Sequence, residues 1–379
     1  MNHSYPNQLV LIGPAWPLRG GISLFTVRLA QAFSKKGIHT KVINFSRLYP
    51  ASLFPGQSQE TPETKSSVGN RTLDSCFPIT WIRSVRRIRD CSPDAVIITW
   101  WHVWFWPCYR YIVWALRKAG FPVFILCHNC WPHESGPGRH WLTRNLLRNS
   151  DGLLFLSRFA QKCWPESGPP SISLFHPFYE WPEWPLHPLG SWTGRILWAG
   201  YGRSYKGLDM ALEILEHDRD LRLTVAGDFY DKNLLTKIQA MQIKYGERLK
   251  LYLRYCTDAE LVRLVDQHDL LLCPYKEVSQ SGMAAFALGR GRPVVATPVG
   301  GLPEQIGLKV GVVAEMASTD ALLEAISAIY SYKPLYWASG IQSVREFWSW
   351  RRLADMLCAS LQDFQRTGNQ KRRNDRNEI

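Results

Sequence analysis

Short apolar runs alternate with longer amphipathic runs along most of the chain. An apolar run bounded by turn residues predicts a buried strand, and an apolar stripe recurring every three to four residues predicts a helix. In the first half this pattern predicts helices at 22–36, near 81–89 and near 109–119. The strands of that half are predicted at 10–12, 39–45, 94–101, 122–127, 151–156 and 172–175.

A second series of the same kind begins at Ile196. Strands that alternate with helices form open parallel sheets, and their ligands bind at the carboxyl ends of the strands. The fold class expected is therefore α/β, with two Rossmann-like parallel-sheet domains facing across a cleft. The strands of the second series are predicted at 196–199, 221–226, 249–253, 270–273, 293–296 and 310–313.

The length of the chain and its loop-forming segments indicate more than one domain. A chain of 379 residues is too long for one ordinary core. Residues 50–76 are typical of a long surface loop, and the proline-rich segment 177–194 is typical of a linker long enough to allow movement. We expect an N-terminal acceptor domain at 1–180, a C-terminal donor domain at 181–345, a helix at 346–365 returning to the first domain, and a disordered basic tail at 366–379.

Two polar, glycine-rich loops follow predicted strands of the second series. The first is GYGRSYKG, with the cations Arg203 and Lys206, and the second contains Glu277, Ser281 and Gly282. Glycines let the backbone approach an anion, helix N-termini offer free N–H groups, and two cations supply full charge. The loops predict a diphosphate site, and a nucleotide-sugar is the favoured ligand. The alternative for both cations is a solvated surface loop.

The net charge of +13 is unevenly distributed. Residues 1–180 hold 20 Lys and Arg against 9 Asp and Glu, whereas the rest of the chain holds 25 against 23. A basic first half predicts an anionic partner, either an anionic membrane surface or a diphosphate-bearing acceptor. The tryptophans between Trp100 and Trp114 suit a membrane interface, or alternatively an aromatic-rich core.

Other compositional features point to the cytoplasm. No signal peptide is visible, and residues 96–116, the longest apolar stretch, contain His102, Pro107 and Arg110, which disfavour a spanning helix. The nine cysteines lie mostly in apolar runs, which predicts reduced thiols. We expect a cytoplasmic protein, peripheral on the cytoplasmic face of the membrane.

At this point the chain resembles a GT-B glycosyltransferase, most closely glycosyltransferase family 4. The resemblance covers nearly the whole length, because weak motifs recur in the family's order and spacing. They are Gly20-Gly21, His128-Asn129 with Pro132-His133-Glu134, Ser157–Ala160, His176–Tyr179, the loop Gly202–Gly207, Gly291–Thr297, Gly300–Glu304 and Phe347–Trp350.

The resemblance implies roles for several residues. Glu277 would bind donor-sugar hydroxyls, and the Gly21 N–H would meet the donor phosphates, unless Gly21 forms a plain turn. His128 would contact the donor sugar, unless it is a core histidine. Glu134 would be an acceptor-side base or would position the sugar, unless it caps a helix. The family also implies retention of anomeric configuration. Closure of the two domains on the donor is expected separately, because each domain offers only half of a site.

One position departs from the family pattern. The family usually carries two glutamates eight positions apart, and Phe286 stands where the second would be. The chain therefore looks like a subset that lacks the second acid. This departure puts recognition of the ribose by a carboxylate in doubt.

No cofactor or metal is expected. Asp218-Arg219-Asp220 has the spelling of a metal-binding Asp-x-Asp, but it falls in a turn far from both loops. The favoured function is transfer of a sugar to a glycan or polyprenyl-diphosphate-linked acceptor in polysaccharide or glycolipid synthesis. The alternatives are a sugar-nucleotide epimerase or a basic, non-catalytic membrane or nucleic-acid binder, although no nucleic-acid module is recognisable.

Overall fold

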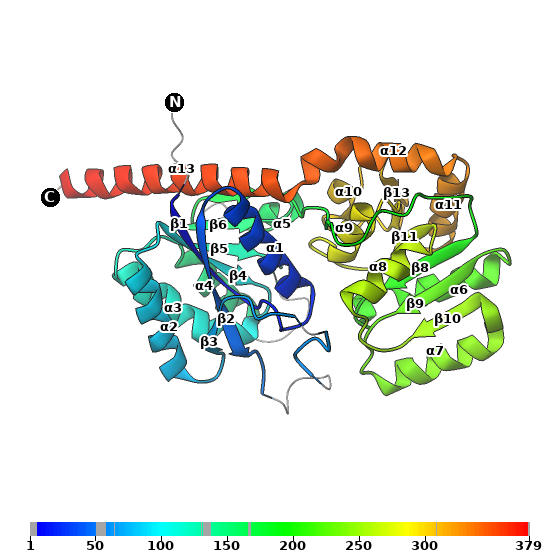
Figure 1. Cartoon of the computed structure of the whole chain (residues 1–379), viewed down its shortest axis with the longest axis horizontal. Helices are drawn as coiled ribbons and strands as arrows, with labels where there is room; N and C mark the ends of the chain where they lie inside the picture. Colours follow the sequence, from blue (N-terminus) through cyan, green and yellow to red (C-terminus); the bar gives the residue numbers. More distant parts are fainter. Residues whose placement is uncertain are drawn as a thin grey trace. The chain divides into compact units, whose positions relative to one another are not determined.

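The protein is described by a computed structural model, and the chain divides into two compact units (Figure 1). The described residues are 6–50, 58–63, 65–129, 131, 138–165, 168–307 and 309–377, with side chains as far as Phe364. Unit 1 comprises Met1–Phe175 with Trp350–Ile379, and unit 2 comprises His176–Ser349. The divisions fall at 175/176 and 349/350, against 180/181 and 345/346 expected from the sequence.

Unit 1 is built on a seven-stranded parallel sheet in the order β3-β2-β1-β4-β5-β6-β7. The order reverses between β1 and β4, as in doubly wound sheets, so right-handed crossovers place helices on both faces. The strands are β1 Gln8–Ile12, β2 His39–Arg47, β3 Asn70–Asp74, β4 Ala95–Trp100, β5 Val123–Cys127, β6 Gly152–Phe155 and β7 Ser171–Ser173.

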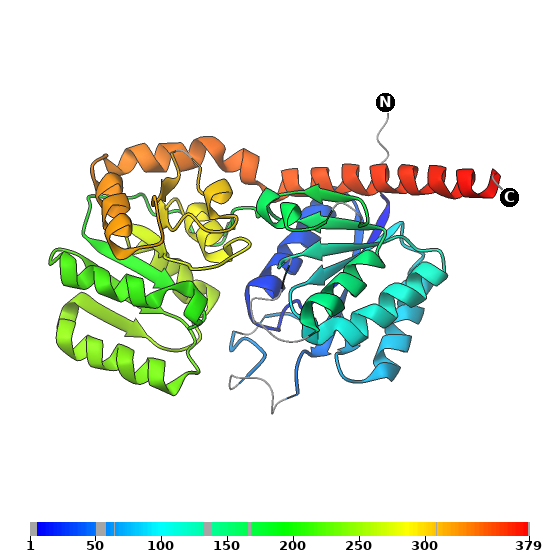
Figure 2. The ribbon, with the colours of Figure 1, turned by 180° about the vertical axis from the view of Figure 1, so that it is seen from behind.

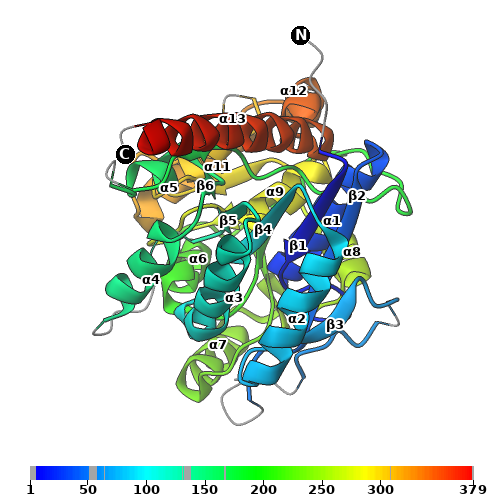
Figure 3. The same cartoon turned by 90° about the vertical axis from the view of Figure 1, so that its left-hand side faces the viewer.

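Helices cover both faces of this sheet. Helices α2, α3 and α4 lie side by side on one face (Figure 3), and α13 packs against α1. The helices of unit 1 are α1 Gly21–Lys35, α2 Pro78–Cys91, η1 Val103–Phe105, α3 Trp106–Lys118, α4 Arg139–Arg148, α5 Arg158–Lys162 and α13 Trp350–Asn377.

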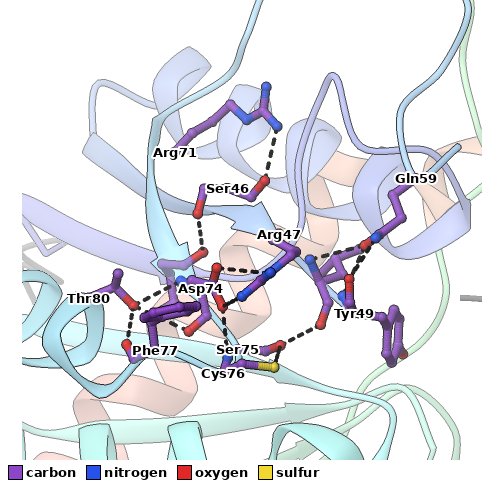
Figure 4. Close-up of polar contacts among 12 residues, drawn as sticks. Ser46, Arg47, Tyr49, Gln59, Arg71, Asp74, Ser75, Cys76, Phe77 and Thr80 are labelled. Carbon is purple, nitrogen blue, oxygen red and sulfur yellow. Dashed lines mark hydrogen bonds and ion pairs between the residues drawn. The ribbon is translucent and has the colours of Figure 1, made fainter. Parts of the chain in front are cut away.

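Strand β3 was not expected, because its residues fall in the predicted loop 50–76. Leu73 is the one strand residue that is fully buried, so the apolar signal is weak. Side chains hold the strand on β2 (Figure 4): Ser46 Oγ donates to the Leu73 carbonyl at 3.2 Å, and Arg47 pairs with Asp74 at 3.0 Å. Tertiary polar contacts therefore define this edge strand.

Helix α13 is the returning helix, and it differs from the prediction in its bounds. It begins at Trp350, after the 3₁₀ turn η4 Arg345–Trp348, and its backbone continues to Asn377, through most of the segment expected as a disordered tail. Trp350 packs edge-to-face on Phe25 of α1, with ring centroids 4.9 Å apart. Phe364, further along α13, stacks on Phe124 of β5 at 5.7 Å.

The aromatic run after Thr99 belongs largely to the core of unit 1. Trp100 is 2% exposed, and Trp101, Trp104 and Trp106 pack against the core with partial exposure. Only Trp114 of this run is well exposed, at 49%. The expected membrane insertion is therefore wrong for Trp100, since its side chain contacts other core residues. Among the described residues, no helix is both long enough and apolar enough to cross a membrane.

Unit 2 repeats the architecture with a six-stranded parallel sheet in the order β10-β9-β8-β11-β12-β13, which confirms the predicted α/β class with two parallel-sheet domains (Figures 1 and 2). Its strands are β8 Arg195–Ala199, β9 Arg222–Ala226, β10 Leu249–Tyr252, β11 Leu270–Cys273, β12 Val294–Ala296 and β13 Gly311–Val313. Its helices are η2 Ser204–Lys206, α6 Leu208–His217, α7 Lys232–Tyr245, η3 Gly246–Arg248, α8 Asp258–Asp266, α9 Gly282–Gly289, α10 Leu302–Gln305, α11 Thr319–Tyr330 and α12 Pro334–Val344.

Part of the expected linker is fixed to unit 2 by two buried arginines. Arg290, 1% exposed, donates to the carbonyls of Trp184 and Pro185 at 2.8 and 2.7 Å, and it pairs with Asp266 at 2.5 Å. Arg292 reaches the carbonyl of His187 at 3.0 Å. Because each cation satisfies several buried acceptors, this stretch is held in place rather than left as a free tether.

Replacing Arg290 by alanine should lower the free energy of unfolding by about 3–5 kcal/mol, because the change leaves the Asp266 carboxylate buried without its partner. Urea unfolding of the full chain measures the difference. Arg263→Ala, on the exposed face of α8, is the matched control and should cost less than about 0.5 kcal/mol. Equal stability of the two variants would contradict the structural role of Arg290.

Candidate functional site

Each sheet has a reversal of strand order, between β1 and β4 in unit 1 and between β8 and β11 in unit 2. In open parallel sheets, ligands bind at the carboxyl ends of the strands at such a point. The two loops singled out from the sequence follow β8 and β11, so both lie at the reversal in unit 2. The candidate donor site is therefore built first from these two loops.

The loop after β8 depends on glycines that allow close backbone contact. Gly207 has φ +63°, and a Cβ there would lie 1.7 Å from the Pro274 carbonyl oxygen. A Cβ at Gly227, which follows β9, would lie 1.7 Å from the Gly200 carbonyl oxygen. No other residue fits these positions. The glycines thus bring the ends of β8, β9 and β11 together around one loop.

The two cations of this loop have different surroundings. Arg203 is exposed, whereas Lys206 is half-buried, with its Nζ 5.2 Å from the centroid of the Tyr275 ring. Burial lowers the pKa of Lys206 to about 8, because an ammonium loses hydration there. Within the described part of the chain, neither side chain forms a salt bridge or donates a hydrogen bond, so both cations are available to an anion.

The loop after β11 leads into helix α9. The Ser281 hydroxyl caps this helix by accepting from the Ala284 amide at 3.1 Å. The amides of Gly282 and Met283 donate to no group in the described residues, so the first turn presents two open N–H groups at the positive end of the helix dipole. Ser281 thereby shapes an anion site, and Gly282 supplies a donor to it.

Gln305 is a site-forming residue that the sequence analysis did not single out. Its side chain accepts from the Ser281 amide at 2.9 Å and donates to the Ser281 carbonyl at 2.8 Å. The Gly300-Gly301 pair precedes it, and a Cβ at Gly300 would lie 1.6 Å from the Val278 carbonyl oxygen. The only sequence signal was the neighbouring Glu304 of the family motif. Gln305, two residues beyond a proline, carried no charge or periodicity that marked it.

Glu277 and Arg203 both lie close to the Tyr205 phenol. Burial raises the pKa of Tyr205, Arg203 lowers it, and Glu277 raises it. Glu277 is exposed at the surface of its loop. The structure thus brings a carboxylate and a guanidinium close enough to Tyr205 to shift its pKa, and Lys206 follows Tyr205 in the chain.

Phe286, at the position of the family's second glutamate, lies inside helix α9. It is 2% exposed and packs against Trp181 and Tyr179, with ring centroids 5.4 and 6.2 Å away. Where the family usually has a carboxylate, this chain has an aromatic ring that packs in a cluster of other aromatic rings. A glutamate at this position would be buried among apolar rings at high cost.

His176 is a second residue of this site that the sequence motifs did not assign a role. A Cβ on Gly282 would lie 3.8 Å from His176 Nε2, so the ring faces the N-terminus of α9. Burial lowers its pKa to about 4, which keeps the imidazole neutral at physiological pH. The His-Pro-x-Tyr motif was noted in the sequence, but nothing in it indicated which element the ring would face.

The candidate residues of unit 1 lie at one edge of its sheet. Gly21 is the first residue of α1 and is exposed, and a Cβ there would have space, since no other part of the described chain beyond its neighbours and its own helix comes within 4 Å. His128 follows β5 and is 4% exposed. Its ring meets Phe25, one turn along α1 from Gly21, at 4.8 Å in an edge-to-face contact. The structure therefore places His128 beside α1, the helix that begins with Gly21.

Two further expectations concern Glu134 and the Asp-x-Asp sequence. Glu134 lies outside the described residues. Asp218-Arg219-Asp220 is a turn between α6 and β9, at the amino end of that strand, where Asp218 accepts from the Asp220 amide at 2.8 Å. Within the described residues, no group of three or more His, Cys, Asp or Glu side chains is arranged to hold a metal ion.

Sequence models of known families match both units. The model described as "Glycosyltransferase Family 4" matches residues 19–177, and the one described as "Glycosyl transferases group 1" matches residues 193–332. A curated relative, GDP-mannose:glycolipid 4-beta-D-mannosyltransferase of Xanthomonas campestris pv. campestris, is 28% identical over 193 residues. The match covers 50% of this chain and 54% of the relative, so the chain spans about half the length of the curated relatives it matches.

Solved structures match over nearly the whole chain. Sucrose-phosphate synthase from Thermosynechococcus elongatus has a TM-score of 0.70 at 15% identity, covering 95% of this chain and 100% of that one. Anabaena HepE in complex with UDP has a TM-score of 0.66 at 13% identity, covering 94% and 100%. Identities this low establish a shared fold alone.

The fold and the family matches together define the chain as a GT-B glycosyltransferase. Within that class it resembles glycosyltransferase family 4, whose model matches most of unit 1, and the resemblance drawn from the sequence motifs is confirmed.

The low pKa of Lys206 predicts how binding of a nucleoside diphosphate depends on pH. Below about pH 8 the amine is already charged, so affinity should vary little. Above it, binding must take up a proton, and affinity should fall by up to about tenfold per pH unit. Calorimetric titration with UDP and GDP between about pH 7 and 9.5 measures this, since the diphosphate is fully charged throughout.

Lys206→Arg is the matched control, because a guanidinium stays charged over the whole range and should flatten the profile. An affinity that stays constant to about pH 9.5 in the wild-type chain, or a profile unchanged by the arginine, would contradict the assignment.

Proposed function

We propose that this chain transfers a sugar from a nucleoside-diphosphate sugar to a hydroxyl of a glycan or lipid-linked acceptor. The observation that supports this most is the edge formed by the loops after β8 and β11. There, the side chains of Arg203 and Lys206 form no salt bridge within the described residues, and they lie in the same unit as the open amides of Gly282 and Met283. Two cations and two backbone donors suit a diphosphate in number and kind.

The chemistry follows from where charge develops. As the bond between the sugar and the diphosphate breaks, negative charge grows on the leaving phosphate oxygens. Arg203 and Lys206 would stabilise that charge, and the Gly282 amide would donate a hydrogen bond to these oxygens at the positive end of the helix dipole. Glu277 would accept hydrogen bonds from hydroxyls of the donor sugar. These interactions strengthen in the transition state, which is the condition for catalysis.

We propose that unit 1 contributes to the same reaction. Gly21, the first residue of α1, would donate to the donor phosphates, and His128 would contact the donor sugar. Glu134 would serve as an acceptor-side base. The positions of Gly21 and His128 beside Phe25 are consistent with one shared role.

We propose that the reaction needs no metal and no cofactor. Fixed side-chain cations would do the work that a divalent ion does elsewhere, and the one Asp-x-Asp lies at the amino end of β9, away from the loops at the carboxyl edge.

The donor and acceptor are proposed from the relatives. The Xanthomonas relative is named for GDP-mannose and a glycolipid acceptor, and the Anabaena structure holds UDP. We propose a nucleotide-sugar donor and a glycan or polyprenyl-diphosphate-linked acceptor, in polysaccharide or glycolipid synthesis. The resemblance to family 4 implies retention of configuration, whereas the Xanthomonas relative is named for a β-linkage. The anomeric coupling constant in the product's NMR spectrum, compared with that of the donor, distinguishes retention from inversion.

We further propose that unit 1 contacts an anionic membrane through the surface formed by α2, α3 and α4 (Figure 3). This surface exposes large apolar side chains, including Ile79 at 61%, Trp114 at 49% and Trp141 at 62%. Cations surround them, since Arg83, Arg86, Arg87, Arg89, Lys118, Arg144 and Arg148 are also exposed. Apolar insertion combined with basic charge is the composition of a membrane-surface contact.

Arg203→Ala and Lys206→Ala should each reduce transfer roughly 30- to 1000-fold, because each removes about 2–4 kcal/mol of transition-state stabilisation. Release of nucleoside diphosphate from a panel of sugar nucleotides, with lipid extract as acceptor, measures the loss. Lys244→Ala, which removes an exposed lysine of α7 paired with Glu216, should leave the rate unchanged. The wild-type rate should also persist in EDTA.

Near-normal turnover in both the Arg203→Ala and the Lys206→Ala variant would refute the assignment of the donor site to this loop. Loss of activity in EDTA that Mg²⁺ or Mn²⁺ restores would instead refute the metal-free mechanism, while leaving the loop assignment in place.

The chain should bind vesicles containing anionic lipid more strongly than neutral vesicles, and binding should weaken with salt. Arg83→Gln with Arg86→Gln should weaken partitioning by about 1 kcal/mol per cation, roughly fivefold each. Trp141→Ala should weaken it without changing the salt dependence. Ile243→Ala, on an 87% exposed side chain of α7, is the control. Equal partitioning of wild type and the double arginine variant would exclude this surface.

A further inference from the structure

A basic pocket lies at the opposite edge of the unit 2 sheet from the candidate donor loops. Its volume is about 400 Å³, and it is lined by residues at the amino ends of β8, β9 and β10 and at the end of α8. The principal cations are Arg195, Arg222 and Lys250. Strand β8 has five residues, so about 15 Å of strand separates this pocket from the donor edge.

The three cations point to one face of the sheet. Arg195 and Arg222 are register partners in adjacent parallel strands, and Lys250 is the register partner of Thr224, two residues beyond Arg222. Residues in register, and residues two apart, share a face. Like charges directly opposite each other destabilise a sheet. Within the described residues, none of these three side chains forms a salt bridge or a hydrogen bond.

The floor of the pocket is polar and already satisfied. His268, 7% exposed, bonds through Nε2 to the Thr224 hydroxyl at 2.7 Å and through Nδ1 to the Leu264 carbonyl. Burial is the main cause that lowers the pKa of His268, and the nearby Arg195 and Lys250 lower it further. The Leu264 carbonyl and the Asp269 carboxylate raise it, but Asp269 is buried and accepts from the amides of Thr193 and Arg195. The uncharged imidazole therefore lies at the floor of the pocket, below a positively charged opening.

The remaining charged residues in the wall do not neutralise this opening. Arg248 is occupied with main-chain carbonyls, among them Leu221 at 3.1 Å and Leu215 at 3.0 Å. Glu247 is a single exposed carboxylate against three open cations, and it forms no ion pair within the described residues. Tyr252, 39% exposed, adds an aromatic ring to the rim. The pocket thus keeps a net positive charge, which a multiply charged anion would neutralise.

We infer that this pocket binds a small phosphate-type oxyanion, as inorganic phosphate, pyrophosphate or a phosphate monoester. Three cations on adjacent strands offer a doubly charged group several charge-assisted donors at once, and a bound anion removes the repulsion between Arg195 and Arg222. The site is separate from the proposed donor site, so it stands or falls independently of the proposed transfer reaction.

The test is calorimetric titration of the full chain with pyrophosphate in low-salt, phosphate-free buffer, using two variants that separate the sites. Lys206→Ala should remove binding at the donor loops and leave binding at the pocket. The double variant Arg222→Gln with Lys250→Gln should do the reverse, weakening pocket binding by about tenfold or more per charge removed. Lys237→Gln, an exposed lysine of α7, is the matched control and should titrate like wild type.

Thermal unfolding gives a readout that a merely damaging substitution would not produce. Without phosphate, Arg222→Gln should unfold at the same or a higher temperature than wild type, because it relieves the repulsion with Arg195. With phosphate, the wild type should gain stability and the variant should not. The inference would be overturned if the Lys206→Ala chain did not bind pyrophosphate. It would also be overturned if that chain still bound pyrophosphate equally well after Arg222→Gln and Lys250→Gln were added.

Discussion

The candidate donor edge of unit 2 depends on backbone contacts that only glycine permits. Positions equivalent to a Cβ at Gly207, Gly227 and Gly300 would each fall within 1.6 to 1.7 Å of a carbonyl oxygen on another loop. A methyl group at any of them would force neighbouring strand ends apart. Because the loops touch backbone to backbone, the side chains they carry have little freedom in where they project. The glycines therefore set the spacing of the charges before any ligand arrives.

This close packing has an electrostatic consequence at Lys206. The amine lies against Gly200 and over the ring of Tyr275, where burial lowers its pKa to about 8. A cation held in partly dry surroundings interacts more strongly with an anion than a fully hydrated one does. The hydration that Lys206 loses on folding is thus offset when a diphosphate binds, and the exposed Arg203 beside it adds attraction that is more sensitive to salt.

Strong periodicity made most of the fold predictable, since the buried strands of both sheets appear in the sequence as apolar runs. The edge strand β3 did not, because its pairing comes from polar side chains such as Ser46 and Arg47. Charges flanked by glycines, such as Arg203, could be found from the sequence. Gln305 could not, since its role depends on meeting Ser281 across the fold. The burial of Trp100 was likewise a matter of tertiary packing, which composition does not express.

The two edges of the unit 2 sheet handle positive charge differently. At the carboxyl edge, cations accompany a helix N-terminus, so charge and dipole add. At the amino edge, a helix C-terminus would normally compensate nearby cations, but the carbonyls at the end of α8 are already occupied. The Leu264 carbonyl meets His268, and the Asp266 carbonyl accepts from Arg292 at 2.7 Å. Arg195, Arg222 and Lys250 therefore gain no hydrogen bond from that helix end, and their mutual repulsion is a cost that folding alone does not explain.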